Sequence, residues 1–253
     1  MPVSKTFEYI KSPSDSSLVL ICDHASNHLP NKMNSLGLSK DHLHSHIAWD
    51  PGSSHLTHTI SKSLHSHAIL ATHSRLLIDL NRDEKHKDLI IQFSDGIKIP
   101  GNFNLKNNQR LIRIKKYYRP YHYFINSLLK KIESKKKKTA IICIHTFTNS
   151  LKNGKKRPWH IGVLHRNDMR LAKPIIKKLS SYNSIKLGVN KPYDGFSSVN
   201  HTMFLHGEKA GRPFVTIEVR QDLLSTKTKE NIQEKLISIL TETISYGFNS
   251  LSI

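Results

Sequence analysis

The chain has few cysteines, few acidic residues beside its many basic ones, and no long hydrophobic run. Only two of its 253 residues are cysteines, Cys22 and Cys143, and each lies inside an apolar run. A disulfide framework is therefore not expected, and a reducing cytoplasm is the default location. No apolar run approaches the roughly 18–20 residues that span a bilayer. Residues 1–17 lack the apolar core of a signal peptide, so we expect no membrane segment.

Several motifs that carry particular chemistries are also missing. The sequence has no G-x-S-x-G nucleophile elbow, no G-x-G-x-x-G and no phosphate-binding loop. A serine or cysteine nucleophile is poorly supported, because both cysteines are predicted to lie in the core. Signatures of helix-turn-helix, zinc-finger and aromatic RNA-binding modules are absent as well.

The net charge of +20, from 39 Lys and Arg against 19 Asp and Glu, raises the question of nucleic-acid binding. Neutralisation of phosphates by basic side chains drives non-specific binding to DNA and RNA. The lysines, however, are spread along helical faces and loops instead of forming one recognition motif. We therefore expect a lysine-rich solvated surface and no nucleic-acid partner.

The hydrophobic pattern predicts one domain over residues 1–253, because no internal repeat and no long linker interrupts it. Continuous apolar runs are typical of strands buried in a parallel sheet, and helical patterns lie between them. This alternation predicts a three-layer α/β/α sandwich with a largely parallel sheet. The predicted strands are Ser17–Asp23, Ala68–His73, Thr139–His145, His160–Leu164 and Phe214–Arg220. Four helices are predicted. The first carries Leu56, Ile60 and Leu64, the second follows Pro120, and the third covers Met169–Leu179. The last begins after a cap at Ser225 or Thr226 and ends at Gly247.

The stretch Ser74–Arg82 reads SRLLIDLNR and combines an apolar run with charged residues. Its leucines and isoleucine predict a further buried strand, which ends in Asp79, Asn81 and Arg82. Burying an unpaired charge is expensive, and an arginine fork can grip a carboxylate through two parallel hydrogen bonds. A small acidic molecule is therefore the expected ligand.

Polar residues fall at the ends of three predicted strands. His24 follows one buried strand, His145 ends another, and Arg82 ends a third. Ligands in open α/β sheets bind beyond the carboxyl ends of the strands. Two imidazoles joined by a carboxylate would form an open zinc site at this edge. Most of the other fifteen histidines lie in polar patterns and are expected to be solvated.

Two aspartates compete to be the third metal ligand. Asp50, in AWDPG, is favoured, although the same position could begin the next helix as an N-cap or turn residue. Asp23 is the competitor. It could instead accept a hydrogen bond from the far nitrogen of a ligating imidazole.

Glu218 lies in the apolar strand PFVTIEVR. Its carboxylate is either paired with Arg212 or Arg220 in a structural bridge or exposed to a cleft. In a zinc hydrolase such a glutamate would be the general base. The pattern alone leaves both interpretations open.

Nine blocks of sequence together resemble the N-formylglutamate amidohydrolase family, in its branch of predicted amidohydrolases. They run in order through nearly the whole chain, which makes the resemblance specific. The blocks are Cys22–Pro30, Ile47–Gly52, Ser74–Arg82, Ser94–Asn102, Tyr117–His122, Ile144–Thr148, Arg157–Leu164, Asn190–Gly195 and Ile217–Leu224.

The resemblance implies a fold and a metal site. The family is similar to zinc carboxypeptidases and aspartoacylases, which have a mixed sheet covered by helices on both faces. By this resemblance His24 and His145 would bind Zn²⁺, and Glu218 would activate water. The glutamate ligand that carboxypeptidase-type sites place three residues after the first histidine is Asn27 here. We therefore expect Asp50 to supply the carboxylate ligand.

The resemblance also implies substrate contacts. Asn81 and Arg82 would bind the α-carboxylate, while Arg75 would polarise the scissile carbonyl or bind a second acidic group. His206 would line the pocket, or simply lie at a helix end before Gly207. The implied function is hydrolysis of a small acidic N-acyl amino acid resembling N-formylglutamate. The alternatives are a zinc peptidase acting on peptide or peptidoglycan-type amides, and a basic nucleic-acid-binding protein without catalysis.

Overall fold

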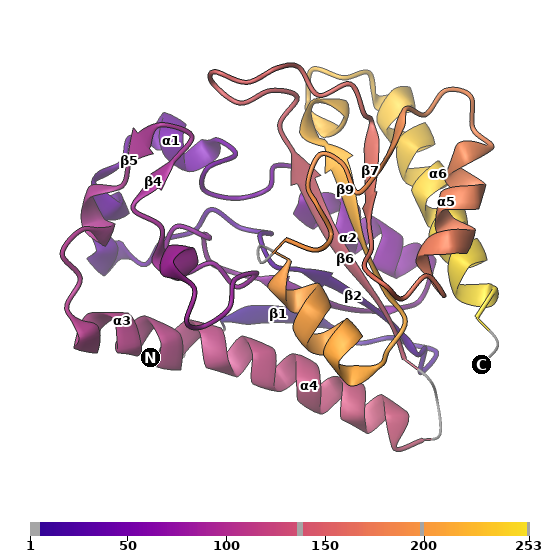
Figure 1. Cartoon of the computed structure of the whole chain (residues 1–253), viewed down its shortest axis with the longest axis horizontal. Helices are drawn as coiled ribbons and strands as arrows, with labels where there is room; N and C mark the ends of the chain where they lie inside the picture. The colour runs from indigo at the N-terminus through magenta and orange to yellow at the C-terminus, as the bar shows by residue number, and fades with distance from the viewer. Residues whose placement is uncertain (1–5, 136–138, 198–199, 252–253) are drawn as a thin grey trace.

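A seven-stranded mixed sheet forms the centre of the protein (Figure 1). The structure is a computed structural model that describes residues 6–135, 139–197 and 200–251. The strand order is β1-β3-β2-β6-β9-β7-β8, with β3, β2, β6 and β9 parallel to one another. Strand β1 is antiparallel to β3, β7 is antiparallel to β9, and β8 is parallel to β7. The strands are β1 (Phe7–Ile10), β2 (Leu18–Cys22), β3 (His67–Ala71), β6 (Ala140–Phe147), β7 (Ile161–Leu164), β8 (Leu187–Val189) and β9 (Phe214–Arg220).

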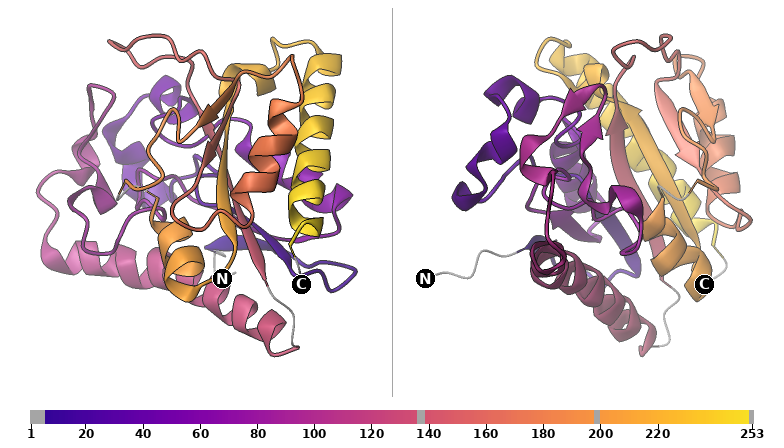
Figure 2. Two further views of the ribbon diagram at one scale, coloured as in Figure 1. Left: turned by 45° about the vertical axis from the view of Figure 1, so that its right-hand side comes forward. Right: turned by 60° about the vertical axis from the view of Figure 1, so that its left-hand side comes forward.

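Helices cover both faces of this sheet (Figures 1 and 2). Helices α2, α5 and α6 pack on one face, and α4 with the π-helix η5 packs on the other, so that each face has its own hydrophobic core. This confirms the predicted α/β fold with a mixed, largely parallel sheet. The covering helices are α2 (Ser53–Ser63), α4 (Arg119–Glu133), α5 (Ala172–Ser180), α6 (Glu230–Asn249) and η5 (Met203–Gly207).

Short elements fill the connections between the strands. A third, smaller core, which includes Leu36, Ile47, Leu76 and Ile99, holds several of them together. They are the helices α1 (Lys40–His44), α3 (Asn107–Arg113), η1 (Asn31–Gly37), η2 (Lys87–Ile90), η3 (Pro100–Asn102), η4 (Ile114–Tyr118), η6 (Glu208–Ala210) and η7 (Gln221–Leu224), with the hairpin β4 (Phe93–Ser94) and β5 (Ile97–Lys98).

The central strands are apolar because both of their faces are covered. All residues of β2 and β6 are buried. Cys22 and Cys143 are free thiols on opposite faces of the sheet, each within a different core. Along α4, buried residues recur every three or four positions, as expected for a helix with one face on a sheet. No helix within the described ranges is both long and apolar enough to cross a membrane.

The segment Ser74–Arg82 is not the strand that its apolar run predicts. It is a buried, irregular turn region, in which Leu76 and Leu77 are fully covered. Side chains, instead of a neighbouring strand, satisfy four of its backbone oxygens, which is why burial alone misled the prediction. The hydrogen bonds run from Asn102 to Leu76 O, from Arg113 to Leu77 O, from His122 to Leu80 O and from Tyr118 to Arg82 O.

The last helix also differs from its prediction at both ends. Helix α6 begins at Glu230, so neither Ser225 nor Thr226 caps it, and it continues through Gly247 to Asn249. A Cβ atom at Gly247 would lie 2.5 Å from a side-chain carbon of Ile175 in α5. This glycine therefore permits close packing of two helices and does not end one.

Candidate functional site

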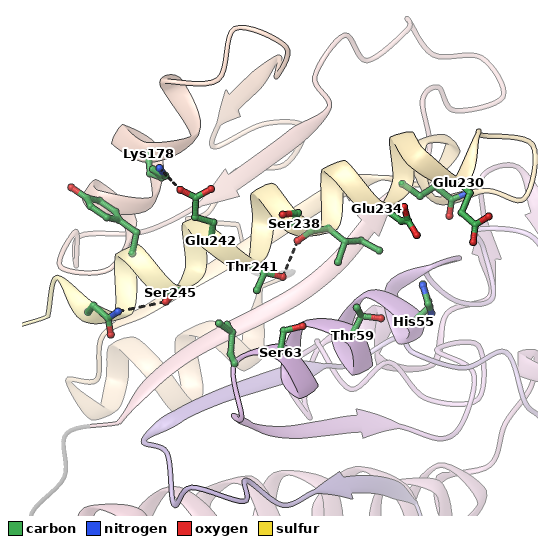
Figure 3. A pocket seen from close by; sticks show the side chains of 15 residues that line it. His55, Thr59, Ser63, Lys178, Glu230, Glu234, Ser238, Thr241, Glu242 and Ser245 are labelled. Carbon is green, nitrogen blue, oxygen red and sulfur yellow. Dashed lines mark hydrogen bonds and ion pairs between the residues drawn. The ribbon is translucent and has the colours of Figure 1, made fainter.

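A cavity of about 210 Å³ lies at the carboxyl ends of β2 and β6. It brings together seven of the eight residues that the sequence predicts for the site. Those seven are His24, Asp50, Arg75, Asn81, Arg82, His145 and Glu218. None of them lines the larger cavity of about 1010 Å³ between α2 and α6, where Lys178 pairs with Glu242 (Figure 3).

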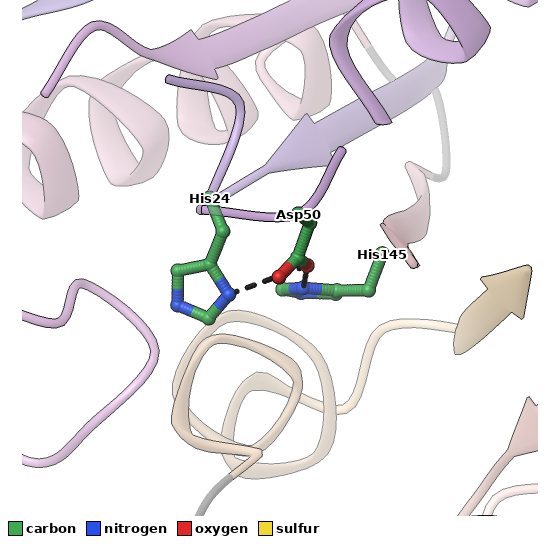
Figure 4. Close-up of side chains that lie close together, drawn as sticks. All are labelled: His24, Asp50 and His145. Carbon is green, nitrogen blue, oxygen red and sulfur yellow. Dashed lines mark hydrogen bonds and ion pairs between the residues drawn. The ribbon is translucent and has the colours of Figure 1, made fainter. Parts of the chain in front are cut away.

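His24, Asp50 and His145 form a compact, fully buried cluster (Figure 4). His24 lies two residues after β2, Asp50 lies in the turn before α2, and His145 is inside β6. The carboxylate of Asp50 lies against both rings: its Oδ2 is 2.8 Å from His145 Nδ1 and 3.4 Å from His24 Nδ1. One ligand atom from each residue lies within 4.8 Å of the others.

The backbone around Asp50 keeps its side chain available for this cluster. Its N–H donates to His24 O (3.0 Å), which ties the two loops together. The residue at the N-cap of α2 is Gly52, with φ of 87°, so the Asp50 carboxylate does not cap the helix. A positive φ favours glycine, because other residues are strained there.

Each histidine has a second carboxylate on its far side. His24 Nε2 donates to Asp79 Oδ1 (2.7 Å), so its Nδ1 is directed at the cluster, and that Nδ1 has no hydrogen-bond partner. His145 Nε2 lies 3.4 Å from Asp23 Oδ2, and Asp23 Oδ1 accepts a hydrogen bond from Tyr121 (2.8 Å). Such carboxylates fix the ring orientation and the tautomer of metal-binding histidines. Asp23 thus lies behind His145 and not behind its sequence neighbour.

Buried charge in the cluster is balanced by mutual pairing. Burial would raise the pKa of Asp50, but His24 and His145 hold it far below its usual value. Burial would lower the pKa of His145, but hydrogen bonds to Asp23 and Asp50 raise it well above its usual value. Asp79 also has a strongly lowered pKa, because Arg82 and Arg75 outweigh the effect of its burial. Ligand atoms this close suit a cation, which would displace the proton on His145.

Glu218 faces the cluster from the neighbouring strand. It is paired in register with His145 across β6 and β9, and both side chains are buried. Its Oε2 has no hydrogen-bond partner, and burial raises the pKa of the carboxyl to about 7. The proposed structural bridges do not form, because Arg212 pairs with Glu133 and Arg220 pairs with Asp222.

The segment Ser74–Arg82 supplies both cavity arginines. Arg75 Nη2 donates to Asp79 Oδ2 (2.9 Å), and its Nη1 lies 3.6 Å from Asp50 Oδ1. Arg82 Nη2 lies 3.7 Å from the same Asp79 oxygen. Asn81 Oδ1 accepts the Thr202 N–H (2.9 Å), which turns the amide nitrogen toward His145 Nε2 (3.5 Å).

His206, expected in the pocket or at a helix end, is not among the residues that line the cavity. It is buried in η5, and its Nε2 lies 2.9 Å from His122 Nδ1. His122 Nε2 donates to Leu80 O (2.9 Å), so its Nδ1 accepts the proton of His206. The pair therefore supports the backbone beside Asn81 instead of facing the cavity.

Three further residues shape the cavity without having been predicted. His46, Asp95 and Tyr193 all line it. Asp95 and Tyr193 lie in two of the blocks that carried the family resemblance, which was a usable signal. The sequence carried no such signal for His46, since this residue lies among many histidines in polar patterns. Asp79 had no predicted role of its own, because its hydrogen bond with His24 joins positions 55 residues apart.

The residues of the cluster fit a metal ion. Two imidazole nitrogens and one carboxylate oxygen form a donor set that zinc uses in catalytic sites with one position left open. The Nδ1 of His24, which lies 3.4 Å from Asp50 Oδ2 but makes no hydrogen bond, is the buried polar atom that such an ion would satisfy. Within the described part of the chain, this is the one group of three or more such residues with this geometry.

Comparison with known proteins gives consistent matches over most of the chain. The family model described as N-formylglutamate amidohydrolase matches residues 16–225. A gene product of Agrobacterium tumefaciens of known structure is 32% identical, with a TM-score of 0.91 over 98% of this chain and 96% of that one. An N-formylglutamate amidohydrolase from Ralstonia eutropha JMP134 is 17% identical, with a TM-score of 0.73 over 97% and 98%. The latter likeness shows the fold alone, and no curated protein matches the sequence.

Proposed function

The chain belongs to the N-formylglutamate amidohydrolase family, and on that premise we propose that it is a zinc-dependent hydrolase of small N-acyl amino acids. The observation that supports this best is the position of Glu218 in the strand beside His145. It puts a buried, unpartnered carboxylate next to a His-Asp-His donor set. Metal-assisted hydrolysis requires this combination of a cation site and a base.

His24 and His145 would hold the ion through their Nδ1 atoms, and Asp50 through its carboxylate. Asp79 and Asp23 keep the two rings oriented from behind. When bound, zinc would lower the pKa of a water molecule and polarise the substrate carbonyl.

Glu218 is the proposed general base and acid. A pKa raised to about 7 by burial suits a group that must both accept and donate a proton near neutral pH. It takes a proton from water as the water oxygen bonds to the acyl carbon. The C–N bond then breaks, and Glu218 passes the proton to the departing amine. The products are a small carboxylic acid and a free amino acid.

The arginines and Asn81 would orient the substrate. Arg75, held in place by Asp79, stabilises negative charge on the acyl oxygen. Asn81 and Arg82 bind the α-carboxylate, for which a planar guanidinium is well suited. His206 supports this region through His122 and has no substrate contact in the proposal.

The size of the cavity favours an acyl amino acid over a peptide. Its 210 Å³ is below the roughly 300–1,000 Å³ typical of sites for drug-sized ligands. A zinc peptidase acting on peptide or peptidoglycan-type amides is therefore the second candidate. We also propose a cytoplasmic location, which agrees with two cysteines that are free and buried.

Metal analysis and turnover together test the function. We expect about one zinc per chain, and hydrolysis of N-formyl or N-acetyl amino acids in preference to peptides. Glu218→Gln should keep the metal and lose turnover, whereas His24→Ala should lose the metal. His55→Ala, which removes an exposed histidine of α2, is the matched control and should change neither. A zinc-loaded protein that cleaves no acyl amino acid would disprove the proposal.

If the protein instead bound DNA or RNA tightly at physiological salt, with a steep salt dependence, the non-catalytic alternative would gain support.

A further inference from the structure

An arginine beside the cavity has no carboxylate partner. Arg157 is half-buried in the connection between β6 and β7, and within the described ranges it forms no ion pair with an Asp or Glu. Arg75 and Arg82, by contrast, both pair with Asp79. A partly desolvated positive charge without a counter-ion favours an anionic ligand. Arg157 contacts three residues that line the cavity, which are Phe147, Thr148 and Tyr193.

Aromatic rings and two oxygen atoms hold the guanidinium of Arg157 in place. Its central carbon lies 5.1 Å from the ring centroid of Tyr193 and 6.0 Å from that of Phe147, within the range in which a ring attracts a cation. Nη1 donates to Thr148 O (3.2 Å) and to the Tyr193 hydroxyl (3.3 Å). Nε and Nη2 have no hydrogen-bond partner among the described residues. Together they form the edge through which a guanidinium binds a carboxylate in two parallel hydrogen bonds.

The Tyr193 hydroxyl connects Arg157 to the cavity. It accepts the Nη1–H of Arg157, so it must donate its own proton elsewhere. No described residue accepts that proton, and Tyr193 lines the cavity. Burial raises the pKa of Tyr193 although Arg157 opposes the rise, so the hydroxyl keeps its proton at neutral pH. An acceptor oxygen on the substrate would complete the hydrogen bond.

Backbone hydrogen bonds fix the connection that carries Arg157. The N–H of Arg157 donates to Asn149 O (2.7 Å), which closes the connection at its base. The Lys152 N–H lies 3.1 and 3.2 Å from the two oxygens of Asp95, which also contacts His46 Nε2 at 3.2 Å. Because Asp95 lines the cavity from the turn between β4 and β5, these bonds tie the connection to another wall of the cavity. Arg157 is therefore preorganised beside the cavity.

A substrate with two carboxylates needs a further cation. Of the described residues that line the cavity, Arg75 and Arg82 carry the permanent positive charges. The proposed mechanism places Arg75 at the acyl oxygen, and Arg82 with Asn81 at the α-carboxylate. Arg157 adds a positive charge next to the same cavity. An acidic side chain would bring a counter-ion to Arg157, whereas an uncharged one would leave it unpaired.

We propose that Arg157 and Tyr193 bind the side-chain carboxylate of an acidic N-acyl amino acid, and that they set the specificity for it. The proposal deepens the proposed function and rests on it. The carboxylate accepts one hydrogen bond from the Tyr193 hydroxyl and two from Nε and Nη2 of Arg157.

Two ligands that differ by one charge test the proposal directly. N-formyl-L-glutamate and N-formyl-L-glutamine are titrated calorimetrically into the zinc-loaded Glu218→Gln variant, which should turn over neither. We expect the glutamate compound to bind about tenfold or more tightly than the glutamine compound. The wild-type enzyme should show the same preference in kcat/KM, through KM and not through kcat.

Two substitutions in the same background isolate the cause. Arg157→Gln removes the charge and keeps an amide donor, and the ratio of the two dissociation constants should fall about tenfold. Tyr193→Phe keeps the ring beside the guanidinium and removes the hydroxyl, and the ratio should fall about threefold or more. Arg170→Gln is the control, because it removes an equal charge from an exposed pair with Asp168 that does not line the cavity. It should leave the ratio unchanged.

Equal or weaker binding of the glutamate compound, or binding of neither compound, would overturn the proposal. An unchanged ratio in Arg157→Gln would overturn the role of Arg157. If Tyr193→Phe in the otherwise wild-type enzyme lowered kcat equally for both compounds and left the ratio unchanged, the hydroxyl would act at the acyl oxygen instead. If the zinc-loaded wild-type enzyme hydrolyses neither compound, the proposed function fails, while the binding ratio still decides the specificity.

Discussion

Acid should destabilise the protein through the buried pair His122 and His206. Burial lowers the pKa of His122 to about 4 and that of His206 to about 3. In the unfolded chain both have a pKa near 6.5. Between these pKa values the unfolded chain therefore binds protons at the two rings that the folded state does not bind. The stability from the neutral pair is fully present above pH 6.5, and it is lost as the pH falls from 6.5 toward the folded-state values.

The magnitude follows from proton linkage. Each histidine contributes a slope of about 1.4 kcal/mol per pH unit within this window. At pH 5, which is about 1.5 units below the unfolded pKa, the loss is about 2 kcal/mol for each ring and about 4 kcal/mol for the pair. Because pH 5 lies above both folded-state values, this result depends mainly on the unfolded pKa.

Urea unfolding at pH 7.5 and pH 5.0, in the presence of a chelator, measures the effect. The double variant His122→Gln/His206→Gln keeps a donor toward Leu80 O and removes both titrating rings. Other titrating groups, such as His73 and Glu218, are present in both proteins and cancel in the comparison. Wild type should lose about 4 kcal/mol more than the variant between the two pH values. A difference below about 1 kcal/mol would refute the reasoning.

Three further predictions concern the site and its strands. Asp79→Asn removes the carboxylate behind His24 and should weaken zinc binding about 10–100-fold in competition with a chelator; unchanged affinity would show that the ring needs no such support. Arg82→Leu should raise KM for N-acyl amino acids far more than it lowers kcat, and a purely kcat effect would place Arg82 elsewhere in the mechanism. Gly162→Ala would put a Cβ atom 2.1 Å from Lys191 O and should cost about 1–3 kcal/mol in denaturant unfolding. Wild-type stability would mean that the Lys191 backbone moves freely.

The sequence predicted the parts of the fold that depend on local pattern. The runs around Cys22 and Cys143 are strands because residues buried on both sides of a sheet are apolar without alternation. The same rule failed at Ser74–Arg82, since an irregular segment buried by side-chain hydrogen bonds has the same composition. The edge strand Phe7–Ile10 was missed, because four residues, of which three are half-buried and one is exposed, carry too little pattern.

In the site, too, the residues placed by local pattern were predicted, and the contacts between distant segments were not. The histidines could be predicted because each lies in or just after a buried strand. The bond from His24 to Asp79 could not, because it depends on how two distant loops meet. The role of His206 was equally hidden, since only the fold shows that its partner is His122.

His145 and Glu218 are partners in register on the neighbouring strands β6 and β9, so the backbone of these strands sets their spacing. Neighbouring strands lie about 4.8 Å apart in every sheet, and side-chain changes hardly alter that distance. Arg75, Asn81 and Arg82, which line the same cavity, lie instead on a connection between elements. Loops tolerate exchange far better than central strands do. New substrates could therefore evolve in this fold by loop replacement, while the reaction itself is inherited unchanged with the sheet.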